Sequence, residues 1–402
     1  MSFVRSTGLA VLAAAMSVTA LTGGTPAGAH ADPAASAAPA APAAPERGKR
    51  GRDAAIQRAV DRLVSRTGLP GAIATVRGGD GKVRTYRAGA GDLRTGRPIP
   101  RDPRVRLGSN NKTFTATVVL QLVAEGRVDL AEPVETYLPG LIRGHGNNGR
   151  RITVRQLLQQ TSGLPDYDSI VLEGGGTLLS MARTYVEPHE LVEAALAERR
   201  HFRPGTRWEY SNTNYIVLGL LAQRITGRPI GEEIERRIID EIGLEDTYWP
   251  ETGEQGIRGR HPRGYLAEKP GDPWVDLTRM DPSFGWAAGK LVGSPRDLGR
   301  FMTALLGGEL LPPAQLREMK KTVRAPHFDP GPGWRYGLGL TTRRLSCDVR
   351  GWGHGGDIQG FETRNLVTPD GRWAVVAVNG LPNTLGMVSD VNRAVDTAIC
   401  RS

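Results

Sequence analysis

The chain has 402 residues, of which 39% are hydrophobic and 23% are charged. This size and composition exclude a small disulfide-stapled domain and an intrinsically disordered chain, and they fit one large domain or two closely packed ones. The formal net charge is +10, but the arginines are interspersed with acidic residues and no aromatic-and-basic recognition motif is present. We therefore expect a solvated cationic surface and no nucleic-acid partner.

The N-terminal segment has the features of an export signal. Arg5 gives a weak positive start, and an apolar run follows from Leu9 to Leu21. This run is too short to span a bilayer, and the small residues at Ala29 and Ala31 fit a signal peptidase cleavage site. We therefore predict a signal peptide at residues 1–31, a secreted protein, and no membrane anchor after cleavage.

The remaining chain divides into a linker and a folded domain. Residues 32–52 consist mainly of Ala and Pro followed by a basic cluster, which predicts an extended linker. In the domain, residues 53–402, strand patterns concentrate at the two ends, whereas residues 127–282 contain mostly helical patches and irregular connections. The pattern predicts an α+β fold, in which strands from both chain ends form one antiparallel sheet flanked by helices and residues 127–282 form a mainly helical lobe.

The elements of the domain are predicted from apolar spacing, capping residues and turn residues. In chain order we expect a helix at residues 54–66 capped by Asp53, strands at 71–77, 82–87 and 105–107, helices at 110–125, 154–160, 188–199, 212–226, 229–242, 294–306 and 314–321, strands at 336–342, 350–352, 362–367 and 373–379, and a last helix that ends at Cys400.

The first candidate functional motif is Gly108-Ser109-Asn110-Asn111-Lys112. Ser109 and Lys112 lie three residues apart at a helix start, so their side chains share one face. A serine hydroxyl is a weak nucleophile until a neighbouring group takes its proton, and the amides of a helix start favour a developing oxyanion. The alternative is a helix-capping serine and a surface lysine, but Lys112 opens a largely apolar run at residues 113–123.

The second motif is Tyr210-Ser211-Asn212, which again lies where a loop enters an apolar helix. A tyrosine hydroxyl held beside a cation can relay a proton, and an asparagine can hydrogen-bond a substrate amide. The alternative is a capping residue beside a core tyrosine.

The third motif is His354-Gly355-Gly356-Asp357. The glycines allow the backbone of a bound substrate to approach this strand closely, so we expect Gly355, Gly356 and Asp357 to contribute to substrate binding. His354 is expected to face the cleft. The alternative is a tight bulge that carries a hydrogen-bonded histidine.

The order Ser-x-x-Lys, Tyr-x-Asn, His-x-Gly resembles that of the penicillin-recognising serine hydrolases, in particular the secreted D-alanyl-D-alanine carboxypeptidases of actinomycetes and the class C β-lactamases. The similarity runs over nearly the whole domain from residue 53. Further matching segments are residues 92–97, 119–123, 136–141, 152–158, 161–165, 336–340 and 345–347. No Gly-x-Ser-x-Gly elbow, zinc-binding His-Glu-x-x-His or paired Cys-x-x-Cys motif is present.

The resemblance implies a mechanism. Ser109 attacks a carbonyl and becomes an acyl ester, which water then releases. Either neutral Lys112 is the base, or charged Lys112 favours a phenolate at Tyr210. His354 completes the proton network, and the oxyanion accepts from the backbone amides of Ser109 and Asp357. No metal and no cofactor is required.

The chain has two cysteines, Cys347 and Cys400. An even number in an exported chain suggests one disulfide, and the two cysteines also resemble the disulfide pair of the secreted carboxypeptidases. The alternative is two free buried thiols.

The sequence departs from the carboxypeptidase pattern in two places. Those enzymes usually have His-Thr-Gly-Thr, whose hydroxyls help to hold the substrate's terminal carboxylate, whereas Asp357 ends the motif here. Their arginine after the Gly-Leu-Gly-Leu segment is Thr341 here, with Arg343 and Arg344 following it. A carboxylate repels another carboxylate, so we expect the site to disfavour a free C-terminal carboxylate and to prefer an amine, an amide or an ester. The alternative is that Asp357 points to solvent and neighbouring arginines substitute.

The predicted function is a secreted serine acyl hydrolase that acts on D-amino-acid peptides, as a D-Ala-D-Ala carboxypeptidase or another D-peptidase, and binds penicillins. The expected partners are a small peptide, ester or β-lactam substrate and cell-wall peptidoglycan. Two alternatives remain: a broad esterase or β-lactamase on the same scaffold, and a non-catalytic penicillin or muropeptide receptor.

Overall fold

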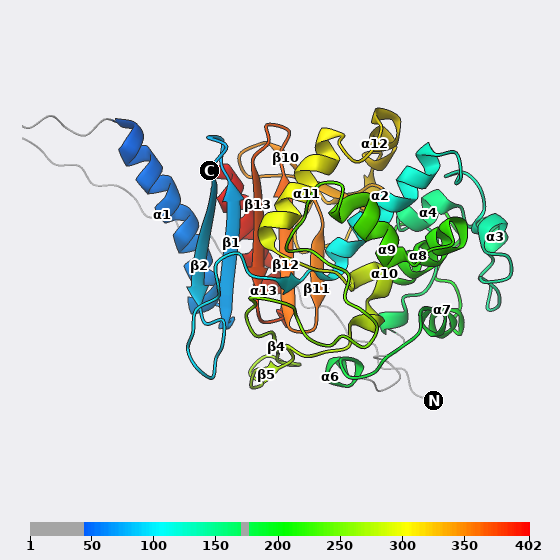
Figure 1. The fold of residues 1–402 in the computed structure, drawn as a ribbon, viewed down its shortest axis with the longest axis horizontal. Coiled ribbons are helices and arrows are strands. Elements are labelled where there is room, and N and C mark those ends of the chain that lie inside the picture. Colours follow the sequence, from blue (N-terminus) through cyan, green and yellow to red (C-terminus); the bar gives the residue numbers. More distant parts are fainter. Residues whose placement is uncertain (1–43, 170–176) are drawn as a thin grey trace, which may run out of the picture. The chain divides into compact units, whose positions relative to one another are not determined.

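The computed structural model describes residues 44–169 and 177–402 (Figure 1). The predicted signal peptide lies outside the described residues, as does the linker up to residue 43. Helix α1 (Ala44–Ser65) begins inside the predicted linker rather than at residue 54. Asp53 is therefore no helix cap, and its carboxylate accepts a hydrogen bond from Tyr86 Oη at 2.7 Å.

A nine-stranded antiparallel sheet forms the centre of the fold, in the order β2-β1-β13-β12-β10-β9-β8-β7, with β11 paired to β12. Its strands are β1 (Gly71–Arg77), β2 (Val83–Gly89), β7 (Val323–Arg324), β8 (Arg335–Tyr336), β9 (Thr341–Arg344), β10 (Arg350–Gly353), β11 (Gly355–Ile358), β12 (Phe361–Val367) and β13 (Trp373–Val378). Strand β1 pairs with both β2 and β13. The prediction that strands from the two ends of the domain form one sheet is thus confirmed.

Strand β13 shows why this sheet is covered on both faces. All its residues are buried, and successive side chains of a strand point to opposite faces. Val376 and Val378 join the apolar cluster with α1 and α13 (Leu385–Cys400). Val375 and Ala377 join the cluster on the other face, where α11 (Pro295–Gly307) packs against β13 (Figure 1).

Most remaining elements are helical and lie on the α11 side of the sheet. They are η1 (Gly108–Asn110), α2 (Asn111–Ala124), α3 (Val134–Tyr137), η2 (Gly149–Arg151), α4 (Val154–Leu158), α6 (Leu178–Met181), α7 (Pro188–Leu196), α8 (Thr213–Thr226), α9 (Ile230–Ile234), the π-helical turn η3 (Glu235–Ile239), η4 (Pro282–Phe284), α10 (Trp286–Gly289) and α12 (Pro313–Met319). Two small two-stranded antiparallel sheets complete the described chain: β3 (Val105–Arg106) pairs with the distant β6 (Val292–Gly293), and β4 (Tyr265–Leu266) pairs with β5 (Val275–Asp276). Over the described residues, no helix combines the length and apolarity needed to cross a membrane.

Helices α2 and α8 form the buried centre of the helical region and contact each other. Most residues of both helices are buried, which explains their largely apolar sequences. Helix α8 ends at Gly227, whose φ of 71° is left-handed, as expected of a glycine cap. The two helices hold the first two sequence motifs at their N-termini.

The prediction of a single strand at residues 336–342 is wrong. The segment contains two short strands, β8 and β9, separated by a turn at residues 337–340. Gly339 causes the break, because its φ is 72° and an added Cβ would lie 2.5 Å from Ala116 Cβ. The turn packs against α2, where Thr113 Oγ1 donates to the carbonyl of Gly339 at 2.8 Å. It thereby supports the helix that carries Lys112.

Candidate active site

Ser109 and Lys112 meet at the start of α2. Lys112 is fully buried, and its Nζ lies 2.9 Å from Ser109 Oγ, 2.5 Å from Asn212 Oδ1 and 2.9 Å from the carbonyl oxygen of Ala288. Neither η1 nor α2 has a side-chain cap. The alternative of a capping serine beside a surface lysine is therefore wrong.

The surroundings of Lys112 favour its neutral form. Burial lowers the pKa of Lys112 to about 7, although the carboxyl groups of Asp166, Asp168 and Asp357 act in the opposite direction. A neutral amine can accept the proton of the Ser109 hydroxyl, which it contacts directly.

Tyr210 contacts the same hydroxyl. Its ring centroid is 5.0 Å from Lys112 Nζ, and its phenol hydrogen-bonds Ser109. Burial raises the pKa of Tyr210 well above its ordinary value; the nearby Tyr336 adds to this shift and the bond to Ser109 opposes it. The phenol is thus protonated at neutral pH.

Asn212 connects Lys112 to two carboxyl groups that the sequence analysis missed. Its Nδ2 donates to Asp168 Oδ2 at 2.8 Å and to Asp166 Oδ2 at 3.2 Å, while its backbone amide donates to Asp166 Oδ1 at 3.1 Å. Burial raises the pKa of Asp166 to about 6 and that of Asp168 well above its usual range. Both ends of the Asn212 amide already have protein partners, so its contact with a substrate amide stays a prediction.

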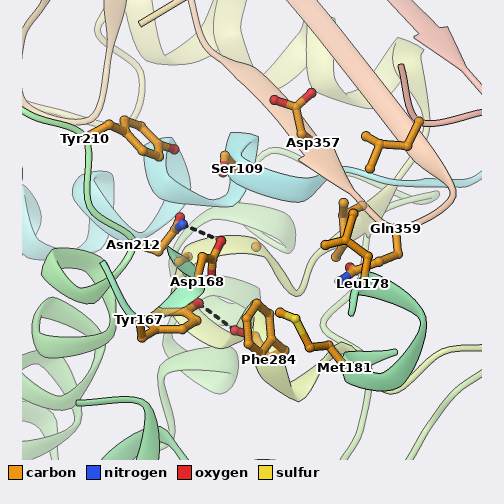
Figure 2. A pocket seen from close by; sticks show the side chains of 15 residues that line it. Ser109, Tyr167, Asp168, Leu178, Met181, Tyr210, Asn212, Phe284, Asp357 and Gln359 are labelled. Carbon is orange, nitrogen blue, oxygen red and sulfur yellow. Dashed lines mark hydrogen bonds between the residues drawn. The ribbon is translucent and has the colours of Figure 1, made fainter. Parts of the chain in front are cut away.

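A cavity of about 230 Å³ opens beside Ser109 (Figure 2). Its wall is formed by Ser109, Tyr167, Asp168, Leu178, Met181, Tyr210, Asn212, Phe284, Gly285, Ala288, Gly289, Asp357, Ile358, Gln359 and Leu381. In Figure 2 the side chains of Asp357 and Asp168 lie on either side of Ser109, and Phe284 and Met181 lie beyond Asp168. The lining residues from the described part of the chain include two carboxyl groups and no lysine, arginine or histidine.

Gly356 of the third motif and Gly108 of the first motif allow close packing within the protein. A Cβ at Gly356 would lie 2.0 Å from the carbonyl oxygen of Leu107, and a Cβ at Gly108 would lie 2.8 Å from that of Asp357. Strand β11 therefore runs directly against η1. Neither Gly355 nor Gly356 lines the cavity, so the expectation that they admit a substrate backbone is not met by this geometry.

His354 does not face the cavity, and that prediction is wrong. The ring is buried, with Nε2 3.0 Å from Tyr336 Oη and Nδ1 2.5 Å from the carbonyl oxygen of Gly355. It packs among aromatic rings, including those of Phe328 and Tyr210, because an imidazole edge fits between ring faces. Burial lowers the pKa of His354 to about 3. The neutral imidazole thus packs beside the Tyr210 ring and helps to hold it in place.

Asp357 reaches the cavity with 55% of its side chain exposed. Arg364 on β12 donates to both of its carboxylate oxygens, at 2.8 and 3.2 Å. The arginines named in the sequence analysis lie elsewhere: Arg343 donates to the carbonyl of Asn392, and Arg344 pairs with an exposed loop carboxylate. The alternative in which these two arginines hold a substrate carboxylate is therefore wrong.

The two cysteines form the predicted disulfide, Cys347–Cys400. It joins the β9–β10 hairpin to the end of α13.

The beta-lactamase family matches residues 56–397 of the chain. The chain belongs to the beta-lactamase family. This beta-lactamase family member is 28% identical over 290 residues to the putative penicillin-binding protein PbpX of Bacillus subtilis (strain 168), a match that covers 71% of this chain and 64% of PbpX. It is 30% identical over 149 residues to protein flp of Staphylococcus aureus, which covers 37% of this chain and 28% of flp. The chain thus spans less than two thirds of these relatives.

Solved structures of two amide hydrolases are similar along nearly their whole length. A D-stereospecific amidohydrolase from Streptomyces sp. is 39% identical with a TM-score of 0.78, covering 85% of this chain and 98% of that one. The D-amino acid amidase of Ochrobactrum anthropi SV3, solved with D-phenylalanine, is 28% identical with a TM-score of 0.75, covering 87% and 98%. The predicted fold is confirmed, and the predicted resemblance is confirmed at the level of the beta-lactamase family.

Proposed function

We propose that this protein is a secreted D-stereospecific hydrolase of amides, peptides and esters of D-amino acids whose α-amino group is free. The observation that carries the proposal is the exposed carboxylate of Asp357 in the cavity beside Ser109, whose described lining residues include no cationic side chain. Export is inferred from residues 1–31 and is consistent with the disulfide, because disulfides persist in oxidising compartments.

The cavity wall argues against a carboxypeptidase. Such an enzyme must hold the terminal carboxylate of its substrate, and the exposed carboxylate of Asp357 would repel that group. A substrate ammonium group is attracted to the same carboxylate. The apolar part of the wall, including Phe284 and Met181, fits a hydrophobic side chain. The similar structures support this choice, because they are named a D-stereospecific amidohydrolase and a D-amino acid amidase.

The contacts support Lys112 as the base for acylation. Neutral Lys112 accepts the Ser109 proton as Oγ attacks the carbonyl carbon, and a tetrahedral oxyanion forms. By the family resemblance, the backbone amides of Ser109 and Asp357 stabilise that oxyanion. The leaving amine takes a proton through the phenol of Tyr210, which Lys112 re-supplies. Water then attacks the acyl ester by the same steps in reverse, which returns Ser109 and releases the D-amino acid.

The proposal is tested with a substrate panel on the wild type and Ser109→Ala. We expect turnover of D-phenylalanine amide, which Ser109→Ala abolishes, and a kcat/KM roughly 100-fold above that for L-phenylalanine amide or N-acetyl-D-phenylalanine amide. A peptide ending in D-Ala-D-Ala should be cleaved more slowly than its C-terminal amide. Preference for the free acid would overturn the proposal.

A second measurement isolates the ammonium contact. Asp357→Asn should raise KM for D-phenylalanine amide and leave p-nitrophenyl butyrate, which has no ammonium, unchanged. Mass spectrometry after incubation with a penicillin addresses the receptor alternative: a lasting adduct on Ser109 without turnover of any amide would favour a receptor, and rapid release of hydrolysed penicillin would favour a β-lactamase.

A further inference from the structure

A buried charge cluster lies directly behind Asp357. Arg364 on β12 has only 5% of its side chain exposed. Besides Asp357, its guanidinium contacts Asp329, with Nε 3.1 Å from Oδ2 and an N–H donated to Oδ1 at 3.2 Å. Glu362 Oε2 is 3.6 Å from the same guanidinium. One cation therefore faces three carboxyl groups.

The three carboxyl groups differ in exposure, which gives them different roles. Asp329 is 7% exposed and Glu362 is 1% exposed, whereas Asp357 is 55% exposed. Burial raises the pKa of Glu362 well above its usual range and raises that of Asp329 as well. Only Asp357 is available to a molecule in the cavity. Arg364 also pairs with Asp329, so its positive charge only partly neutralises the negative charge of Asp357.

The register of the sheet explains how Arg364 reaches Asp357. Gly355 is opposite Arg364, and Asp357 is opposite Glu362. Arg364 and Asp357 are thus diagonal neighbours on one face of the β11–β12 pair. Gly355 leaves the space, because a Cβ there would lie 3.0 Å from Arg364 Nε. The residue that holds Asp357, Arg364, therefore comes from the sheet and not from the cavity wall.

We propose that Arg364 is a positioning residue that holds the carboxylate of Asp357 toward the substrate ammonium group. Asp329 then sets substrate affinity, because it pairs with Arg364 and so reduces the extent to which Arg364 neutralises Asp357. This inference rests on the proposed function. It adds a specificity determinant, Asp329, which does not line the cavity. Removing the charge of Asp329 leaves Arg364 to neutralise Asp357 and weakens binding of a cationic substrate only.

The test compares two substrates in Asp329→Asn. For D-phenylalanine amide we expect KM to rise about fivefold, the range of one partly exposed charge interaction, with kcat unchanged within about twofold. For p-nitrophenyl butyrate both constants should stay at wild-type values. Asp348→Asn is the matched control, because it removes one carboxylate at an exposed loop position that does not line the cavity, and it should change the kinetic constants of neither substrate.

The outcomes separate this inference from the proposed function. If Asp357→Asn raises KM for the amide and Asp329→Asn does not, the inference is overturned and the proposed function stands. If Asp357→Asn has no effect, both are overturned. An equal loss on both substrates in Asp329→Asn would show a structural role and would also overturn the inference. If thermal unfolding shows that Asp329→Asn is not folded, Arg364→Lys replaces it: a lysine cannot hold both carboxylate oxygens, so KM for the amide alone should rise.

Discussion

Lys112 Nζ lies 2.9 Å from Ser109 Oγ, in direct contact and one helical turn away. The pKa of Lys112 is lowered to about 7 by burial, so this contact predicts the pH dependence of the reaction. Below pH 7 the ammonium form predominates and cannot accept the Ser109 proton. Above pH 7 the amine is neutral. We therefore expect kcat/KM for p-nitrophenyl butyrate, which has no titrating group of its own, to rise about tenfold per pH unit below 7 and to level off above it.

The assignment of this titration to Lys112 is checked with Lys112→Met. The variant should lose roughly a thousandfold or more in kcat/KM. Its residual activity should no longer change through pH 7. A residual activity that still rises with pH up to pH 7, as in the wild type, would contradict Lys112 as the titrating base.

Tyr210→Phe should affect amides more than activated esters. The leaving amine of D-phenylalanine amide must be protonated, and we expect kcat for this substrate to fall by about 10² to 10³. A p-nitrophenolate leaving group needs no proton, so p-nitrophenyl butyrate should be hydrolysed at a rate within about tenfold of the wild type. Equal losses for both substrates would instead indicate that Tyr210 takes the proton from Ser109.

His354→Asn should lower activity without moving the pH profile. The pKa of His354 is lowered to about 3, so His354 titrates well below the pH range in which activity rises through deprotonation of Lys112. The variant loses the contact with Tyr336, so its thermal unfolding temperature should fall. A shift of the activity rise near pH 7 by one unit would show that His354 shares the titrating proton.

The parts of the site that depend on local spacing were predictable from the sequence. Ser109 and Lys112 lie on one helical turn, and that geometry follows from their separation of three residues. Likewise, β-type runs at both ends of the domain predicted the sheet, because both faces of β13 needed apolar partners. These predictions required no knowledge of how distant segments pack.

The parts that depend on tertiary register were not predictable. Arg364 reaches Asp357 only because Gly355 is opposite it in the β11–β12 pair, and that register is not written in either segment alone. Asp168 is recognised as a site residue only from the structure, in which its carboxyl group accepts a hydrogen bond from Asn212 at the start of α8. The motif Thr-Ser-Gly-Leu-Pro, which ends one residue before Asp166, was the available signal for this loop.

The disulfide should stabilise the protein without contributing to catalysis. Cys347 and Cys400 are 53 residues apart in sequence, which predicts a stabilisation of up to about 4 kcal/mol in the chain-entropy model. The double variant Cys347→Ser/Cys400→Ser should unfold at a lower urea concentration. Its kcat/KM for D-phenylalanine amide should stay near the wild-type value, because neither cysteine lines the cavity. A large loss of kcat at a temperature where the variant is folded would contradict this separation.

Gly356→Ala should disrupt the reacting geometry through the backbone. A Cβ at this position would lie 2.0 Å from the carbonyl oxygen of Leu107 and 2.5 Å from Asn110 Nδ2. Both groups lie in the segment that carries Ser109, and Asn110 Nδ2 also donates to the carbonyl of Leu107. Strand β11 must therefore shift, which moves Asp357 relative to the nucleophile. Because a displacement of about 1 Å costs roughly 100-fold in rate, we expect a loss of that size in kcat.

The matched control is Gly256→Ala, where an added Cβ meets nothing within 4 Å. Gly256→Ala should keep the wild-type kcat and unfolding temperature, whereas Gly356→Ala should lower both. The two substrates distinguish the cause. A shifted β11 misplaces the backbone amide of Asp357, which is expected to serve every acyl group, so Gly356→Ala should lose activity on p-nitrophenyl butyrate as well as on D-phenylalanine amide. A loss confined to the amide substrate would mean that the shift affects only the Asp357 carboxylate and would remove the support for the oxyanion role of its backbone.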